Sequence, residues 1–143
     1  MVSARCLDRF IAEHRLPDAF RNTATTIYEP VAEWLRRRLA SKTPFLLGIN
    51  GAQGTGKSTL AAYLALALGE SGQRNVAILS IDDFYLTKAE RRQLAQTVHP
   101  LLATRGVPGT HDVPMLRDCL SRLRALKAGE RCRLPRFDKA ADD

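Results

Sequence analysis

Aromatic residues, paired cysteines and long apolar runs are all scarce in this chain of 143 residues. Phe, Trp and Tyr together make up 6% of the residues, which leaves few rings on which nucleic-acid bases could stack. The cysteines Cys6, Cys119 and Cys132 form no C-x-x-C pair, so we expect reduced thiols rather than disulfides or a zinc site. No apolar run approaches the roughly 18 residues of a membrane span, and the first residues lack the apolar core of a secretory signal. We therefore expect a cytoplasmic protein without a membrane partner.

The charge of the chain is strongly positive, at a formal net +7, and suits a polyanionic ligand. With 45% hydrophobic and 26% charged residues, the chain has the composition of one globular domain. Many positive charges fall on predicted helical faces, at residues 36–38, 91–92 and 122–127, where we expect solvated surface. Together with the shortage of aromatic residues, this distribution argues against nucleic acid as the primary ligand.

A glycine-rich segment matches the pattern G-x-x-x-x-G-K-[ST] at every position. An apolar run at residues 44–49 predicts a buried strand before it, and residues 58–68 predict a helix after it. Such a loop wraps a polyphosphate with backbone N–H groups at a helix N-terminus, where the helix dipole favours negative charge. The alternative is a glycine-rich turn that binds nothing, which the flanking strand and helix disfavour. The predicted phosphate-binding residues are Gly51, Ala52, Gln53, Gly54, Thr55, Gly56, Lys57, Ser58 and Thr59.

Each residue type in this loop has a chemical reason. Glycines let the backbone approach phosphate oxygens without an intervening Cβ. Lys57 is expected to reach the β- and γ-phosphates, and the Ser58 hydroxyl to bind Mg²⁺. The cofactors predicted from this motif are therefore ATP and Mg²⁺.

The hydrophobic pattern around the loop predicts an α/β fold. Residues 7–14 and 18–40 have helical spacing, with a kink or restart at Pro30, and form a helical segment over residues 1–43. The apolar stripe of the second helix is predicted to be Phe20, Ile27, Val31, Trp34, Leu35 and Leu39. Residues 75–81 are a second apolar, β-branched run, so strand, loop, helix and strand form a βαβ unit. Residues 44–143 are thus predicted to be a P-loop NTPase-type core, a parallel sheet flanked by helices.

Two further helices are predicted after the second strand. The first covers residues 87–98, with Thr87 as N-cap and Glu90 completing a capping box. The second covers residues 113–128 and is ended by Gly129. Two glycines and a proline indicate a loop at residues 105–110.

Two adjacent acids, Asp82 and Asp83, follow the second predicted strand. Ligands of open α/β sheets bind at the C-terminal ends of strands, so these carboxylates are expected to face the same crevice as the phosphate loop. In phosphoryl transfer to an alcohol, an aspartate can accept the proton of the hydroxyl, or it can hold the metal through water. An Asp that caps the next turn is the structural alternative.

Four stretches together resemble the D-glycerate 3-kinase type of the glycerate kinase family. They are GINGAQGTGKSTL, LSIDDFYLT, HPLLATRGVPGTHDVPML and LPRFDK, and the likeness runs from about Leu7 to the last residue. The family is similar to the P-loop kinases that include uridine kinase, phosphoribulokinase and bacterial pantothenate kinase. The resemblance implies ATP-dependent transfer of a phosphoryl group to a hydroxyl of D-glycerate or a similar small hydroxy acid.

The resemblance also assigns roles to residues. It implies that Asp82 is the general base, while Asp83 stands where relatives often have a small polar residue. The stretch 105–112 is similar to the acceptor-side loop, where Arg105 could grip a substrate carboxylate. His111 and Asp112 either bind substrate hydroxyls or stabilise the loop, Asp112 being a good N-cap. The predicted catalytic residues are Lys57 and Asp82, the metal ligands are Ser58 and Asp82, and the substrate residues are Asp83, Tyr85, Arg105, His111 and Asp112; the roles of Arg136, Asp138 and Lys139 stay open.

The family resemblance implies a longer chain than these 143 residues. Relatives place a third strand between the two predicted here, and a second acidic metal motif and an arginine-bearing lid follow later in their chains. We therefore expect an incomplete sheet, in which the chain retains nucleotide affinity while its activity alone is doubtful. The alternatives are a nucleotide-binding module without catalysis, and a kinase for a nucleoside or a pantothenate-like alcohol.

Overall fold

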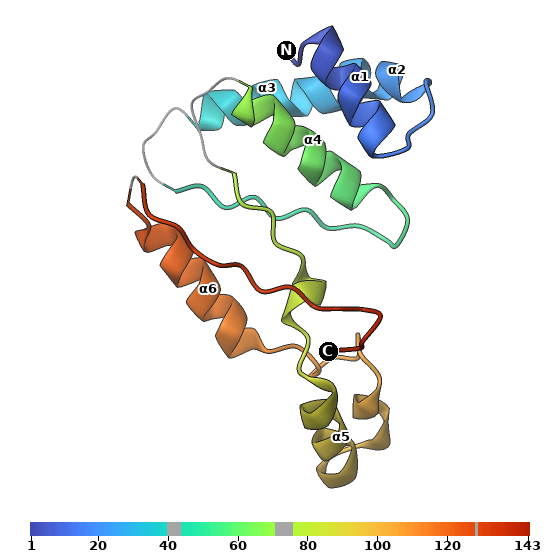
Figure 1. Ribbon diagram of the computed structural model, residues 1–143, viewed down its shortest axis with the longest axis vertical. Helices are drawn as coiled ribbons and strands as arrows, with labels where there is room; N and C mark the ends of the chain where they lie inside the picture. The colour runs from blue at the N-terminus through green and yellow to red at the C-terminus, as the bar shows by residue number, and fades with distance from the viewer. Residues whose placement is uncertain (40–43, 71–75, 128) are drawn as a thin grey trace. The chain divides into compact units, whose positions relative to one another are not determined.

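The computed structural model describes residues 1–39, 44–70, 76–127 and 129–143. They form two compact units, Met1–Ile78 and Leu79–Asp143. In the first unit the elements are α1 (Ala4–Glu13), α2 (Phe20–Thr23), the π-helix η1 (Ala24–Tyr28), α3 (Glu29–Arg38) and α4 (Lys57–Gly69) (Figure 1). In the second unit they are the 3₁₀-helix η2 (Ile81–Phe84), α5 (Lys88–Thr97), the 3₁₀-helix η3 (Pro100–Ala103) and α6 (Val113–Ala125).

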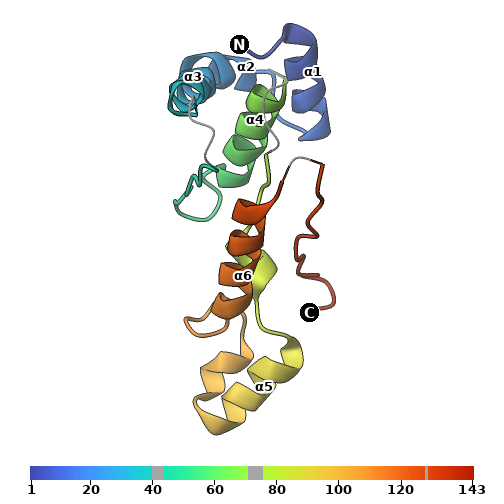
Figure 2. The ribbon, with the colours of Figure 1, turned by 90° about the vertical axis from the view of Figure 1, so that its left-hand side faces the viewer.

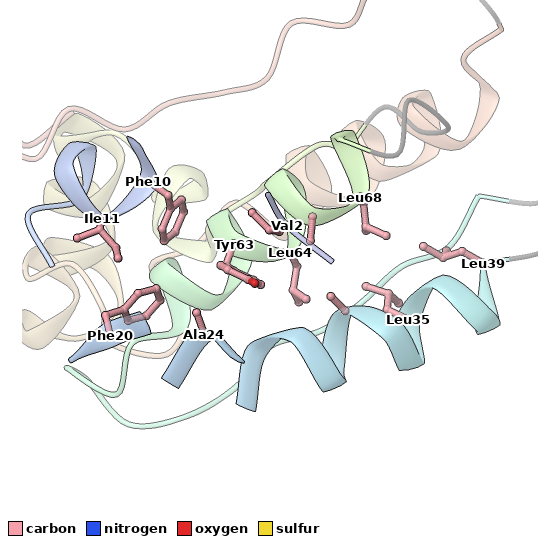
Figure 3. Close-up of a cluster of buried hydrophobic side chains, with 12 residues drawn as sticks. Val2, Phe10, Ile11, Phe20, Ala24, Leu35, Leu39, Tyr63, Leu64 and Leu68 are labelled. Carbon is pink, nitrogen blue, oxygen red and sulfur yellow. The ribbon is translucent and has the colours of Figure 1, made fainter. Parts of the chain in front are cut away.

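The core of the first unit lies where α4 packs against α1 and α3 (Figures 2 and 3). The ring of Phe10 lies 5.9 Å from that of Phe20 and 5.7 Å from that of Tyr63. Leu35 of α3 and Leu64 of α4 are 3% and 4% exposed, so the N-terminal helices bury one face of the helix that follows the phosphate loop. This packing anchors the phosphate loop at the start of α4.

Within the predicted helix 18–40, α2, η1 and α3 follow one another without a break over residues 20–38, with a π-turn immediately before Pro30. A π-turn holds one more residue than an α-helical turn, so a stripe with one uniform period cannot stay on one face across it. The predicted packing of Ile27 and Trp34 is therefore wrong, since they are 56% and 45% exposed. The Trp34 ring instead lies under the guanidinium of Arg38, 4.6 Å from its central carbon. Residues 40–43, at the predicted segment boundary, lie outside the described residues, and that boundary stays a prediction.

The predicted parallel sheet is not confirmed. Residues 44–50 and 76–80 run without helical turns, and the described parts of the chain contain no paired strands, while Asn75 lies outside them. Ile81 opens the 3₁₀-helix η2 rather than closing a strand. Leu46 and Val76 are 72% and 41% exposed, as expected for strand-like segments that lack a neighbour. A strand must exchange its N–H and C=O bonds with an adjacent strand, and the intervening strand expected from the resemblance is not among the described residues.

The second unit confirms the predicted helix starts. Thr87 and Glu90 form the capping box of α5: the Glu90 carboxylate accepts from the Thr87 amide at 2.8 Å. Asp112 caps α6, which ends at Ala125, three residues before the predicted end. All three cysteines are unpaired thiols, as predicted. Among the helices that the structure describes, none has both the length and the apolar character needed to cross a bilayer.

Candidate functional site

The phosphate loop leads directly into α4, which begins at Lys57. Gly54 and Gly56 have φ angles of +79° and +81°, in the left-handed region that favours glycine. A Cβ on Gly51 would lie 3.0 Å from Oγ1 of Thr55, so the Thr55 side chain would have to shift to accommodate it. The backbone path of the loop thus favours glycine at positions 54 and 56, and the Thr55 side chain leaves little room for anything larger at position 51.

The amide groups of the loop remain available to a ligand. Thr55 Oγ1 and Lys57 Nζ donate to the Ala52 carbonyl at 2.8 and 2.7 Å, which folds the lysine back onto the loop. Within the residues described, no acceptor is found for the amides of Gly54, Gly56, Lys57 and Ser58. Unpaired N–H groups at a helix N-terminus form an anion site, because the amides and the helix dipole both favour negative charge.

A tyrosine from the π-turn lies behind the loop. The Tyr28 hydroxyl is 3.4 Å from where a Cβ on Gly56 would stand. Its ring is held edge-on by Phe20 and Tyr63, at centroid distances of 5.3 and 5.4 Å. The N-terminal helices therefore reach the phosphate loop, a contact that the sequence did not indicate because it depends on the π-turn.

The first unit offers a fitting ligand for a magnesium ion. Ser58 is exposed at the first turn of α4, and Mg²⁺ is commonly held by few protein oxygens together with phosphates and waters. No group of three or more His, Cys, Asp or Glu side chains comes together in the described segments. Ser58 would therefore hold the ion together with nucleotide phosphates. The predicted metal role of Asp82 stays a prediction.

In the second unit, the acidic turn is η2. Ser80 Oγ accepts from the Asp82 amide at 3.3 Å, and the Asp83 carboxylate accepts from the Ser80 amide at 3.4 Å, which together make a capping box. Asp83 is also paired with Arg136, at 2.6 Å. The carboxylate of Asp83 thus caps the turn and ties it to residue 136.

Asp82 is held by two donors. Lys139 Nζ lies 2.8 Å from Oδ2, and the Tyr85 hydroxyl donates to Oδ1 at 3.0 Å (Figure 1 shows the C-terminal segment passing η2). The hydrogen bond from Lys139 lowers the pKa of Asp82, outweighing the opposite effect of burial. Burial, and then the bond to Asp82, raises the pKa of Tyr85. Asp82 is therefore ionised at neutral pH, while its predicted role as general base stays a prediction.

The predicted acceptor loop is fixed beside this turn. Tyr85 and His111 form an antiparallel bridge, and their rings lie 4.5 Å apart. Asp112 donates its amide to the Phe84 carbonyl at 2.7 Å, and its carboxylate accepts from Met115 as the cap of α6 at 2.8 Å. The structure thus shows the stabilising role of Asp112, while a substrate role for His111 or Asp112 stays a prediction.

Arg105 contacts the C-terminal segment, together with a second arginine. Its Nη1 donates to Asp142 Oδ1 at 2.8 Å and to the Lys139 carbonyl at 3.2 Å. Arg91 pairs with the same carboxylate at 3.0 Å and is fully buried, so its predicted place on a solvated helical face is wrong. A polar face of α5 becomes interior because the segment 137–142 folds over it, which helical periodicity cannot reveal.

The predicted residues fall into two groups. Residues 51–59 lie in the first unit, whereas Asp82, Asp83, Tyr85, Arg105, His111 and Asp112 lie in the second unit and are linked there by the contacts given above. Sequence reasoning left Lys139 without a role and missed Arg91, Phe137 and Asp142. Only the resemblance of the LPRFDK stretch pointed toward this segment.

Comparison with known proteins finds kinases. The chain is 43% identical over 99 residues to the "Uncharacterized kinase mug58" of Schizosaccharomyces pombe, covering 68% of this chain and 35% of that protein. It is 35% identical over 95 residues to the "Probable ATP-dependent kinase TDA10" of Saccharomyces cerevisiae, with coverages of 64% and 32%. It is 30% identical over 104 residues to a "Pantothenate kinase" of a Nocardioides species, with coverages of 72% and 30%. The chain thus spans about a third of the length of these relatives.

A solved structure is also similar. It is described as "Structure of YGR205w protein", is 31% identical in sequence and superposes with a TM-score of 0.63 over 83% of this chain and 42% of its own. No protein-family model matches the chain. The homologues are therefore proteins named as kinases, one of them as ATP-dependent.

Proposed function

We propose that the protein is a P-loop small-molecule kinase, which transfers the γ-phosphoryl group of ATP to a hydroxyl of D-glycerate or a similar small hydroxy acid. The observation that carries the proposal is the phosphate loop, where four amides at the N-terminus of α4 have no acceptor among the residues that the structure describes. The names of the relatives support nucleotide-dependent phosphoryl transfer.

The residues of the chain divide the chemistry between them. The loop amides and Lys57 bind the phosphate oxygens, and Lys57 must leave the Ala52 carbonyl to do so. Mg²⁺, when bound at Ser58, neutralises charge on the phosphates. The acceptor oxygen forms the new bond to the γ-phosphorus, the bond between that phosphorus and the bridging oxygen breaks, and ADP leaves. Asp82, whose carboxylate is ionised, takes the proton of the acceptor hydroxyl.

The acceptor is proposed from the basic groups of the second unit. Arg105 is 36% exposed, and its fork geometry suits a carboxylate. The same argument admits pantothenate, which is also a carboxylic acid with hydroxyl groups, and relatives are named as pantothenate kinases. A nucleoside acceptor is disfavoured, because the acceptor loop at residues 105–112 contains His111 as its only ring that could stack on a base.

Two measurements test the proposal. The first is the ATP-dependent shift in thermal unfolding, which at 100 times the dissociation constant corresponds to about 2.7 kcal/mol. Lys57→Met should reduce the shift, and its absence in the unaltered chain would refute nucleotide binding altogether. The second is ADP formation with D-glycerate, pantothenate or uridine as the added acceptor. Turnover that depends on D-glycerate, and that Asp82→Asn abolishes while the ATP shift persists, supports the kinase and its base.

The remaining outcomes separate the alternatives. Turnover with pantothenate alone replaces the acceptor and leaves the reaction in place. ATP binding without turnover on any acceptor supports the nucleotide-binding module instead. The module is worth testing because the chain spans about a third of the length of its relatives, and its two strand-like segments find no neighbouring strand among the described residues.

A further inference from the structure

Two arginines far apart in the sequence share one carboxylate. Arg91 Nη2 lies 3.0 Å from Oδ2 of Asp142, and Arg105 Nη1 lies 2.8 Å from Oδ1. Each carboxylate oxygen therefore faces a different guanidinium. The planar fork of an arginine matches the geometry of a carboxylate, so two guanidinium groups around one carboxylate make a site suited to a carboxylic acid.

Arg91 has more N–H donors than Asp142 accepts from. Its side chain is 1% exposed, and the described part of the chain provides no hydrogen-bond acceptor for its buried Nε and Nη1 atoms. The ring of Phe137 lies 5.7 Å from the central guanidinium carbon of Arg91 and 5.8 Å from that of Arg105. The two cations thus border one partly apolar site, and one of them has donor capacity left over, which is costly for a purely structural pair.

Asp142 reaches this site from a small closed loop. The backbones of Asp138 and Asp143 exchange two hydrogen bonds, of 2.7 and 3.1 Å. Asp142 itself has a φ of +61°, which is uncommon for a residue other than glycine. Its side chain is 32% exposed and that of Arg105 is 36% exposed, so solvent reaches the outer edge of the pair.

The arginine pair is connected to the proposed base through one residue. The Lys139 carbonyl accepts from Arg105 at 3.2 Å, while the ammonium group of Lys139 donates to Asp82 at 2.8 Å. The Tyr85 ring, whose hydroxyl donates to Asp82, lies 5.2 Å from that of Phe137. A small acid bound at the arginines would therefore lie in the same side-chain cluster as the base.

We propose that Arg91 and Arg105 form the binding site for the carboxylate group of the acceptor, and that the Asp142 carboxylate occupies this site as an internal competitor. The proposal rests on the proposed function for its ligand class, small hydroxy acids. It assigns Arg91 to substrate binding and gives residue 142 a part in setting the affinity. Binding requires the Asp142 side chain to withdraw from both guanidinium groups.

Calorimetric titration without nucleotide tests this competition. D-glycerate should bind Asp142→Asn at least tenfold more tightly than it binds the unaltered chain, because the competing charge is gone. Asp118→Asn is the matched control, since it removes one charge from an exposed pair with Arg122. Glycerol, which lacks the carboxylate, should gain nothing from either substitution. Pantothenate serves as a second carboxylate probe, and a gain with either acid supports the site.

Double substitutions test whether the two guanidinium groups are the donors to the acid. Adding Arg91→Lys or Arg105→Lys to Asp142→Asn should remove the gain in affinity, because lysine keeps the positive charge but lacks the planar pair of N–H donors of arginine. Adding Arg92→Lys, an exposed neighbour on α5, should leave it intact. The proposal would be overturned if Asp142→Asn and Asp118→Asn bound both acids with equal affinity. It would also be overturned if the gain in affinity persisted after both arginine changes, or if glycerol showed the same gain.

A second measurement covers the case in which Asp142→Asn does not fold. Millimolar D-glycerate should then shift the ¹⁵Nε resonances of Arg91 and Arg105 in the unaltered chain, while glycerol should not, and unmoved resonances would refute the site. Because no nucleotide is present, the result is independent of phosphoryl transfer. If the acids bind but no turnover is found, the binding site is retained and the proposed kinase function is refuted. If turnover is found but Asp142→Asn shows no gain in affinity, the kinase function is retained and the binding site is refuted.

Discussion

Removing the hydroxyl of Tyr63 tests how the first unit holds the helix behind the phosphate loop. The hydroxyl donates to Oε2 of Glu29 at 2.9 Å, and the two residues are 2% and 7% exposed. Arg36 holds the other carboxylate oxygen at 2.9 Å. Tyr63→Phe deletes one donor to a buried charge and leaves the ring in place.

The expected cost follows from the type of bond. A hydrogen bond to a charged group contributes about 1.5–3 kcal/mol, and Glu29 keeps its bond to Arg36, so we expect a loss of about 2 kcal/mol for Tyr63→Phe. For a unit of this size, that corresponds to a fall in Tm of about 8–16 °C.

The loss should depend on pH in one direction. Burial alone would raise the pKa of Glu29, but the hydrogen bonds from Arg36, Tyr63 and the N-terminal residues together outweigh it and hold that pKa below its usual value of 4.5. A lowered carboxylate pKa stabilises the fold above about pH 4.5, and this stability is lost as the pH falls through the folded-state pKa. The difference between the unaltered chain and Tyr63→Phe should therefore be largest near neutral pH and shrink below pH 4.5.

Urea unfolding at several pH values, followed by far-UV circular dichroism, measures this difference. Tyr28→Phe is the matched control: its ring lies in the same aromatic cluster, and its hydroxyl has no hydrogen-bond partner among the described residues. Equal losses for the two substitutions, or a loss for Tyr63→Phe that stays constant from pH 7 to pH 3, would refute the reasoning.

Three other changes have defined outcomes. Gly56→Ala should lower the free energy of unfolding by about 1–2 kcal/mol, because Gly56 has a left-handed φ of +81°, and it should weaken the ATP-dependent thermal shift. Gly69→Ala, at the end of α4, is the control: the space around Gly69 is open, so this change should not destabilise the chain. Thr87→Ala should cost about 1 kcal/mol in urea unfolding through loss of the α5 capping box, and Thr87→Ser should restore most of it; equal losses for both would contradict the cap. Lys139→Met should raise the pKa of Asp82, so that stability is lost at a higher pH on acidification, and an unchanged carboxyl titration by NMR would count against the contact.

The elements predicted correctly are those whose signals are local. The phosphate loop, the capping box at Thr87 and the cap at Asp112 are each determined by a few consecutive residues and their backbone groups. The helix of residues 58–68 is confirmed within one residue at each end, because its start is set by the loop itself.

The elements predicted incorrectly depend on partners distant in sequence. Two apolar runs could be identified as strand-like, but a strand exists only with a neighbour, and none is found in the described parts of the chain. Ile27 and Trp34 were placed in the core by a uniform helical period that the π-turn interrupts. Arg91 was placed in solvent, although a segment about fifty residues later buries it.

The local sequence is enough to predict a tight glycine-rich loop that leads into α4, since glycine at positions 54 and 56 permits the left-handed backbone found there. Which charges face each other could be seen in the folded chain alone: Lys139 lies beside Asp82, and Arg91 and Arg105 lie around Asp142. The difference lies in the sequence separation of the interacting groups. Backbone conformation follows from neighbouring residues, whereas the pairing of charged side chains depends on where distant segments of the chain meet. The residues next to a charged side chain in the sequence therefore do not show which residue it will pair with.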